Sequence, residues 1–149
     1  MADSDLNRLY SGRILALAAA IPRTGRLTGP QGTARRRSPL CGSTITADVV
    51  LQEGRISEFA QDVRACALGQ ASAAILGEVV LGLRRADLEA ARAAVQAMLL
   101  GGPAPAAPFD GYAALIPARD YRNRHGSILL ALDAAAAAVA AAEGSAETG

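Results

Sequence analysis

Three side chains in this sequence bind soft or borderline metals well, namely Cys41, Cys66 and His125. They are far apart along the chain, and we expect each of them at the boundary of a helix or strand. This arrangement is typical of a site that is assembled at one end of a domain. The alternative is that both thiols are small buried apolar groups and that the histidine caps a helix or lies at the surface. Spacing alone leaves both interpretations open.

The local sequence around each cysteine indicates what its thiol could do. Cys66 stands where an expected strand ends and an expected helix begins, and a helix N-terminus favours the thiolate form. Cys41 precedes Gly42 at a junction between a loop and a strand, where glycine permits an unusual backbone conformation. His125 opens the last expected helix.

Hydrophobic periodicity predicts an α+β fold, in which a small three-stranded antiparallel sheet packs against about five helices. Alternating apolar residues indicate strands, and apolar residues at spacings of three and four indicate helices. The expected elements are a helix over 5–21 ended by Pro22, a loop over 23–32, strands over 33–37, 43–51 and 55–63 with a turn at Glu53–Gly54, helices around 71–79 and 88–99, a hinge over 101–108, a short helix over 111–117 and a last helix over 125–142.

Composition limits the class of protein. The 149 residues suit one domain over 1–149, with flexible ends about 1–4 and 143–149. A net charge of +1, with arginine supplying all 15 basic residues, argues against a nucleic-acid binder. No run of 18 apolar residues is present, so we expect no membrane span. Two cysteines without an export signal predict a cytoplasmic protein.

Two segments resemble a known family. The stretch Ser38-Pro-Leu-Cys-Gly-Ser-Thr-Ile-Thr-Ala-Asp48 is followed by Ala65-Cys-Ala-Leu-Gly-Gln-Ala-Ser-Ala73, and both are similar to motifs of the iron–sulfur cluster assembly scaffolds, the NifU N-terminal and IscU-like or SufU-like proteins. The segment Leu9-Tyr-Ser-Gly-Arg-Ile-Leu15 resembles the first-helix motif of that family. The likeness runs from about residue 6 to residue 142.

The resemblance implies that Cys41, Cys66 and His125 hold a transient [2Fe–2S] cluster or zinc. This chain departs from the family pattern at two places. Ser43 stands where the family has an aspartate of the metal site. Gly126, or Ser127 under the SufU-type alignment, stands where the family has its third cysteine.

We therefore expect a scaffold or sulfur acceptor rather than a catalyst, present as a monomer or weak dimer. The resemblance implies a cysteine desulfurase and iron–sulfur acceptor apoproteins as partners, with neither nucleic acid nor a membrane involved. A fourth ligand could be water, Asp62, Asp120 or a partner's cysteine. The basic run Arg35–Arg37 could dock an acidic partner or simply be a solvated face. The alternative functions are a regulator or binding module that keeps the fold without cluster assembly, and a zinc-dependent sulfur-relay partner.

Overall fold

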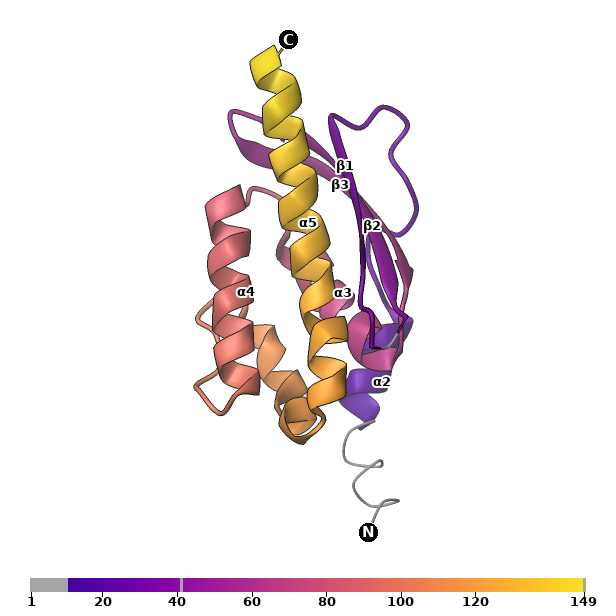
Figure 1. Ribbon diagram of the computed structural model, residues 1–149, viewed down its shortest axis with the longest axis vertical. Helices are drawn as coiled ribbons and strands as arrows, with labels where there is room; N and C mark the ends of the chain where they lie inside the picture. Colours follow the sequence, from indigo (N-terminus) through magenta and orange to yellow (C-terminus); the bar gives the residue numbers. More distant parts are fainter. Residues whose placement is uncertain (1–10, 41, 149) are drawn as a thin grey trace.

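The computed structural model describes residues 11–40 and 42–148 (Figure 1). Those residues form three strands and five helices, one of them a 3-10 helix, which confirms the predicted α+β class. In chain order the elements are α2 (Gly12–Ala19), β1 (Gly32–Arg37), β2 (Thr44–Gln52), β3 (Arg55–Arg64), α3 (Ala67–Val79), α4 (Arg85–Leu99), the 3-10 helix η1 (Asp110–Asp120) and α5 (Arg122–Thr148).

The sheet is an antiparallel meander in the order β1-β2-β3. Glu53 and Gly54 join β2 to β3 with φ angles of 55° and 79°, so both residues adopt the left-handed conformation that a two-residue hairpin turn requires. The glycine adopts this conformation without a steric penalty. The predicted turn and the predicted strands on either side of it are confirmed.

The long helix α5 lies along the inner face of the sheet, with α3 and α4 also packed against it (Figure 1). The inner face is apolar because alternate residues of β2 point toward the helices: Ile45, Ala47 and Val49 are at most 1% exposed. Alanine lines much of α5, which makes that helix thin. Its buried residues are Ile128, Leu129, Leu130, Ala131, Leu132, Ala134, Ala135, Ala138, Val139 and Ala142.

One stretch of α5, Arg122–Gly144, is long and apolar enough to cross a membrane by length and composition, with a mean hydropathy of 1.6. However, 61% of its most apolar window is buried inside the fold. It contacts β1, β2, α3 and α4. It is therefore the core helix around which the other elements pack.

Strand β1 begins in direct contact with this helix at Gly32. A Cβ atom at Gly32 would lie 2.1 Å from the carbonyl oxygen of Ala138 and 2.5 Å from the amide nitrogen of Ala142. No side chain fits at these distances, so the absence of a Cβ sets how closely the sheet approaches α5.

A buried hydrogen-bond network joins η1, α3 and α5. The hydroxyl of Ser72 lies 2.6 Å from the carbonyl oxygen of Ile128 and 2.9 Å from the hydroxyl of Tyr112. The Tyr112 hydroxyl also donates to the carbonyl oxygen of Ser72. Burial raises the pKa of Tyr112, so its hydroxyl stays protonated and available as a donor.

Some helix boundaries differ from the predictions. Helix α2 begins after Ser11, whose hydroxyl accepts a hydrogen bond from the Ile14 amide, and residues 5–10 of the predicted first helix lie outside the described residues. The predicted helix over 111–117 is a 3-10 helix that contains Pro117, which cannot donate a backbone hydrogen bond. Helix α5 continues to Thr148, beyond the predicted end at residue 142.

The close approach at Gly32 predicts a large effect from adding one methyl group there. We expect Gly32→Ala to lower the free energy of unfolding by about 2 kcal/mol or more, because the sheet and α5 must move apart. The matched control is Gly29→Ala, since a Cβ at Gly29 meets no atom within 4 Å. Urea denaturation of both variants measures the difference. Equal stability of the two variants would contradict the packing argument.

Candidate functional site at the Cys66 thiol

Three segments that are distant in the sequence meet around the half-buried thiol of Cys66. They are the loop between β1 and β2, the start of α3 and the start of α5. Ser43 from the loop and Ser127 from α5 are 3% and 0% exposed, and their hydroxyl oxygens are 3.0 Å apart. The Ser127 hydroxyl is also near enough to Cys66 to lower the pKa of its thiol. A chain of polar groups therefore links Ser43, Ser127 and Cys66.

Cys66 is the N-cap residue of α3, with an extended backbone at φ −66° and ψ 171°. The strand that precedes it ends at Arg64, so the chain reverses direction at this residue. The first amides of a helix have no partner within that helix. Cys66 makes no side-chain capping hydrogen bond to these amides, but those of Gly69 and Leu68 lower the pKa of its thiol. The predicted position of Cys66, at the junction of a strand and a helix, is confirmed.

Close packing of glycines brings the start of α5 to this thiol. A Cβ at Gly69 would lie 2.8 Å from the Cβ of Ala65 and 3.2 Å from the carbonyl oxygen of Ser127. A Cβ at Gly126 would lie 3.1 Å from the hydroxyl of the buried Ser38. Position 126 therefore faces Ser38, whereas position 127 faces the thiol. Between the two alignments left open by the sequence, this geometry favours Ser127 as the residue at the site.

The surroundings of Cys66 favour its thiolate. Burial raises the pKa of the thiol, but donors from Gly69, Ser127, Leu68 and Arg124 lower it by more, so the pKa of Cys66 lies below its ordinary value. Arg124 is one helical turn before Ser127, so both residues lie on the same side of α5. That spacing of three residues was readable in the sequence, but only the fold shows that this side faces Cys66.

His125 makes its hydrogen bonds at the end of η1. Its Nε2 atom lies 3.0 Å from the carbonyl oxygen of Ala118 and 3.1 Å from that of Arg119. Carbonyl oxygens only accept, so Nε2 carries the proton and donates to both. In the neutral ring, Nδ1 is then the nitrogen with a free lone pair. No hydrogen bond joins His125 to Cys66 within the described residues.

Cys41, the other predicted thiol ligand, lies outside the described residues. Within residues 11–40 and 42–148 no group of three His, Cys, Asp or Glu side chains is close enough to hold a metal ion. Asp62 is instead 3.7 Å from Arg64, on the outer face of the sheet. The exposed Asp120 lies beside the end of α4, in a hollow shared with Leu100 and Gly101.

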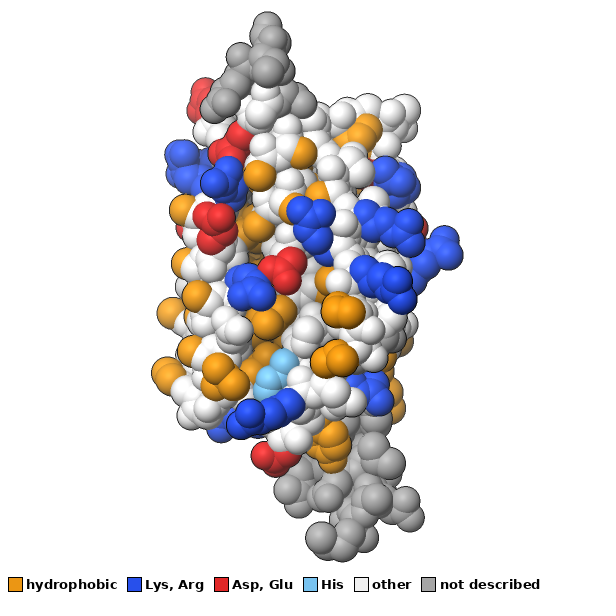
Figure 2. Space-filling view, in the orientation of Figure 1, with side chains coloured by type: hydrophobic (Ala, Val, Ile, Leu, Met, Phe, Trp, Pro, Cys, Tyr) orange, Lys and Arg blue, Asp and Glu red, His pale blue; other side chains and the backbone are white. Residues whose placement is uncertain are grey.

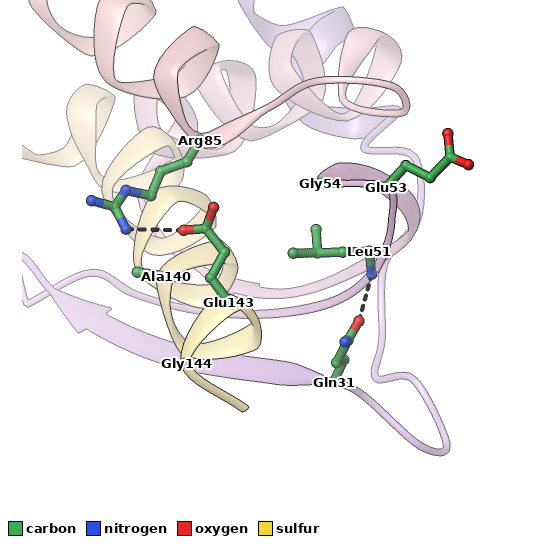
Figure 3. A pocket seen from close by; sticks show the side chains of 8 residues that line it. All are labelled: Gln31, Leu51, Glu53, Gly54, Arg85, Ala140, Glu143 and Gly144. Carbon is green, nitrogen blue, oxygen red and sulfur yellow. Dashed lines mark hydrogen bonds and ion pairs between the residues drawn. The ribbon is translucent and has the colours of Figure 1, made fainter. Parts of the chain in front are cut away.

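A separate cavity of about 680 Å³ lies at the other end of the molecule (Figure 3). Two pairs of its polar groups bond each other: Arg85 bonds Glu143 at 2.9 Å, and the Leu51 amide donates to Gln31. Ala140, which also lines it, is thirteen residues along α5 from Ser127, or roughly 20 Å at the rise of a helix. This cavity is therefore not part of the Cys66 site.

The geometry defines a class of protein: a small α+β domain with a stabilised, half-exposed thiol at the end of its sheet. Comparison with solved structures narrows the class. The chain is similar to a nitrogen-fixing NifU-like protein (N-terminal) from Brucella abortus, with 40% identity and a TM-score of 0.89 over 94% of this chain and 98% of that one. No protein-family model matches the chain, and comparison with curated proteins returns no match.

Two more distant structures share the fold. An iron–sulfur cluster assembly scaffold protein for the SUF system from Fervidobacterium islandicum is 17% identical, with a TM-score of 0.80 over 89% of this chain and 98% of that one. A hypothetical protein is 24% identical, with a TM-score of 0.77 over 90% and 98%. Given the 40% identity over almost the whole chain, this protein belongs to the NifU-like family of iron–sulfur cluster assembly scaffolds.

The donors around Cys66 predict a reactive thiol whose pKa depends on Ser127. In a Cys41→Ser background, we expect the rate of alkylation by iodoacetamide to rise with pH through a midpoint below the ordinary thiol pKa. Ser127→Ala should move that midpoint to higher pH, because the thiolate loses a donor. The control is Ser57→Ala, which removes an exposed hydroxyl bonded to the Val50 carbonyl. An unchanged midpoint in Ser127→Ala would contradict the assignment.

Proposed function

We propose that this protein is a cytoplasmic scaffold that holds a transient [2Fe–2S] cluster, or zinc in its resting form, and passes the cluster to acceptor apoproteins. A cysteine desulfurase would supply the sulfur. The observation that carries the proposal is the Cys66 thiol, which is partly exposed at the N-terminus of α3 and has a lowered pKa that favours its thiolate. The family to which the chain belongs supports the same function.

The proposed ligands are the thiolates of Cys41 and Cys66 and the Nδ1 atom of His125. Thiolates bind iron and zinc well, and imidazole can share the task in both kinds of site. A ligating histidine usually donates its other ring N–H to a carbonyl group, as Nε2 of His125 does to Ala118 and Arg119. The tautomer of His125 therefore fits metal binding. Because α5 turns about 100° per residue, His125 lies about 200° around the helix from Ser127, so the first turn of α5 would have to rearrange for Nδ1 to reach the metal.

Ser43 and Ser127 determine how many strong metal ligands the proposed site has. A neutral hydroxyl is a poor ligand for iron or zinc, so Ser43 and Ser127 leave the site with fewer strong ligands than a complete tetrahedral set. Their hydrogen bond to each other satisfies both buried hydroxyls without a metal. A cargo held by so few protein ligands would be labile, which suits a protein that must release it.

The presence of Ser127 at the place of the third thiolate favours a second candidate function. Where the family resemblance implies a third thiolate, Ser127 is buried and hydrogen-bonded to Ser43. A protein that kept the fold and the docking surfaces but lost cluster assembly would carry this kind of replacement. Such a protein would regulate a cysteine desulfurase, with zinc or nothing at the site.

Anaerobic reconstitution with iron and sulfide tests the proposal. We expect wild type to retain a [2Fe–2S] chromophore and to transfer it to apo-ferredoxin. Cys66→Ser should abolish retention, and Ser43→Ala should change it little, because the thiolate is a strong ligand and the hydroxyl is not. Visible circular dichroism and iron analysis after desalting measure both. If wild type retains no cluster while its fold is intact, the regulator is the better assignment.

The pH dependence of zinc affinity tests the role of His125. A ligating imidazole must be neutral, so protons compete with the metal for its ring nitrogen. Affinity of wild type should therefore rise from pH 5.5 to 7.5 more steeply than that of His125→Ala. The control is His125→Asn, which keeps a polar group beside the η1 carbonyls but supplies no imidazole. Parallel curves for wild type and both variants would remove His125 from the ligand set.

A further inference from the structure

The outer face of the sheet carries exposed arginines at the end that leads to Cys66. In the strand register, Thr44 of β2 lies between Arg37 of β1 and Arg64 of β3. Arg35 is two residues before Arg37 in β1, so it lies on the same face of the sheet. The opposite face of β2 is buried, so these side chains point away from the core. Arg35, Arg37 and Arg64 are called the arginine face below. All three are exposed, and in Figure 2 arginine side chains gather along the side of the strands.

The charge on this side of the sheet is not balanced. Arg26 is neutralised by the buried carboxylate of Asp48 at 2.6 Å, and Arg64 lies 3.7 Å from Asp62. The guanidinium groups of Arg35 and Arg37 have no ion pair within the described residues. At this end of the sheet four arginines therefore face two aspartates, which leaves two positive charges in excess; Glu58 lies on the same face four residues before Asp62. A hollow of about 470 Å³ lies on this face, and its lining residues are Arg26, Arg35, Arg64, Asp62, Thr33, Thr44 and Thr46.

The arginine face continues into the Cys66 site. Arg64 is two residues before Cys66, and Thr44 directly follows Ser43, which belongs to the site. In the loop that follows Arg37, Leu40 is 78% exposed. Exposed guanidinium groups, an exposed leucine and a reactive thiol are thus found at the same end of the molecule.

The chemistry of this surface fits a protein better than a nucleic acid. Asp62 lies among the arginines and would repel a phosphate backbone. Of the described residues that line the hollow, none is aromatic, so bases would have nothing to stack on. A planar guanidinium pairs well with a carboxylate, and a leucine beside it can enter an apolar pocket.

We propose that the arginine face and Leu40 form a docking surface for an acidic protein segment, which places its reactive group beside Cys66. The proposal rests on the proposed function only in taking Cys66 as the reacting thiol. Carboxylates of the partner would pair with Arg35 and Arg37, which have no partner within the described part of the chain. Docking raises the local concentration of whatever the partner carries, so reaction at Cys66 should be faster with an acidic carrier than with a neutral one.

Thiol exchange with a charged carrier tests this directly. The probe is an octaglutamate peptide with a C-terminal cysteine activated as its mixed disulfide with 5-thio-2-nitrobenzoate. The Cys66 thiolate attacks the peptide sulfur, a new disulfide joins the peptide to Cys66, and the nitrobenzoate thiolate leaves with a measurable absorbance. The neutral probe has eight glutamines instead. Both rates are measured in the Cys41→Ser background at about 50 mM salt, where surface charges are little screened.

We expect the glutamate probe to react at least about tenfold faster than the glutamine probe, with the ratio falling toward one as salt is raised. Arg35→Glu/Arg37→Glu should abolish the preference, and Arg35→Gln/Arg37→Gln should reduce it. The matched control is Arg55→Glu/Arg84→Glu, which makes the same change in net charge at the other end of the sheet and should keep the preference. In each variant both probes react with the same thiol, so the ratio of the two rates does not depend on a change in the pKa of Cys66.

Two outcomes overturn the proposal. Equal rates for both peptides in wild type would show that the surface does not attract carboxylates. A larger acceleration by an activated single-stranded oligonucleotide of the same charge would show that it attracts nucleic acid instead. Neither outcome depends on cluster retention, so this proposal and the proposed function can fail separately.

Discussion

The close contact between α5 and the sheet is the constraint on which the rest of the fold depends. Gly32 lets β1 touch the backbone of α5 at Ala138 and Ala142, and alanine keeps that helix thin enough to be surrounded by other elements. With α5 fixed in this way, its first turn lies beside the start of α3 and the loop after β1. Gly69 and Gly126 remove the side chains that would hold those segments apart. The thiol site is therefore a product of helix packing.

Much of this architecture could be predicted from the sequence. Alternation in β2 and β3 and the Glu53–Gly54 turn were sufficient for the hairpin, and the position of Cys66 at a helix N-terminus followed from a change in period. The environment of that thiol could not be predicted in the same way. Arg124 and Ser127 are 58 and 61 residues after Cys66 in the sequence, and nothing local indicates which side of α5 faces it. Such contacts depend on packing at glycines, which periodicity does not reveal.

The two serines that set this chain apart from the family pattern are best understood together. Ser43 and Ser127 come from different elements, yet their hydroxyls bond each other 3.0 Å apart inside the protein. A carboxylate beside a hydroxyl would place a charge in this buried space, and a thiol beside a hydroxyl would make a weaker hydrogen bond there. One hydrogen-bonded pair thus accounts for both departures, and it leaves Cys66 as the thiolate that this pair supports.

The arginine face has a consequence for control of the protein. All 15 basic residues of the chain are arginine, and the guanidinium group stays charged throughout the physiological pH range. A surface built from lysine could lose its charge by acetylation, but this one has no lysine that could be modified in that way. Acetylation therefore cannot switch off binding at the sheet, because arginine carries every positive side-chain charge there.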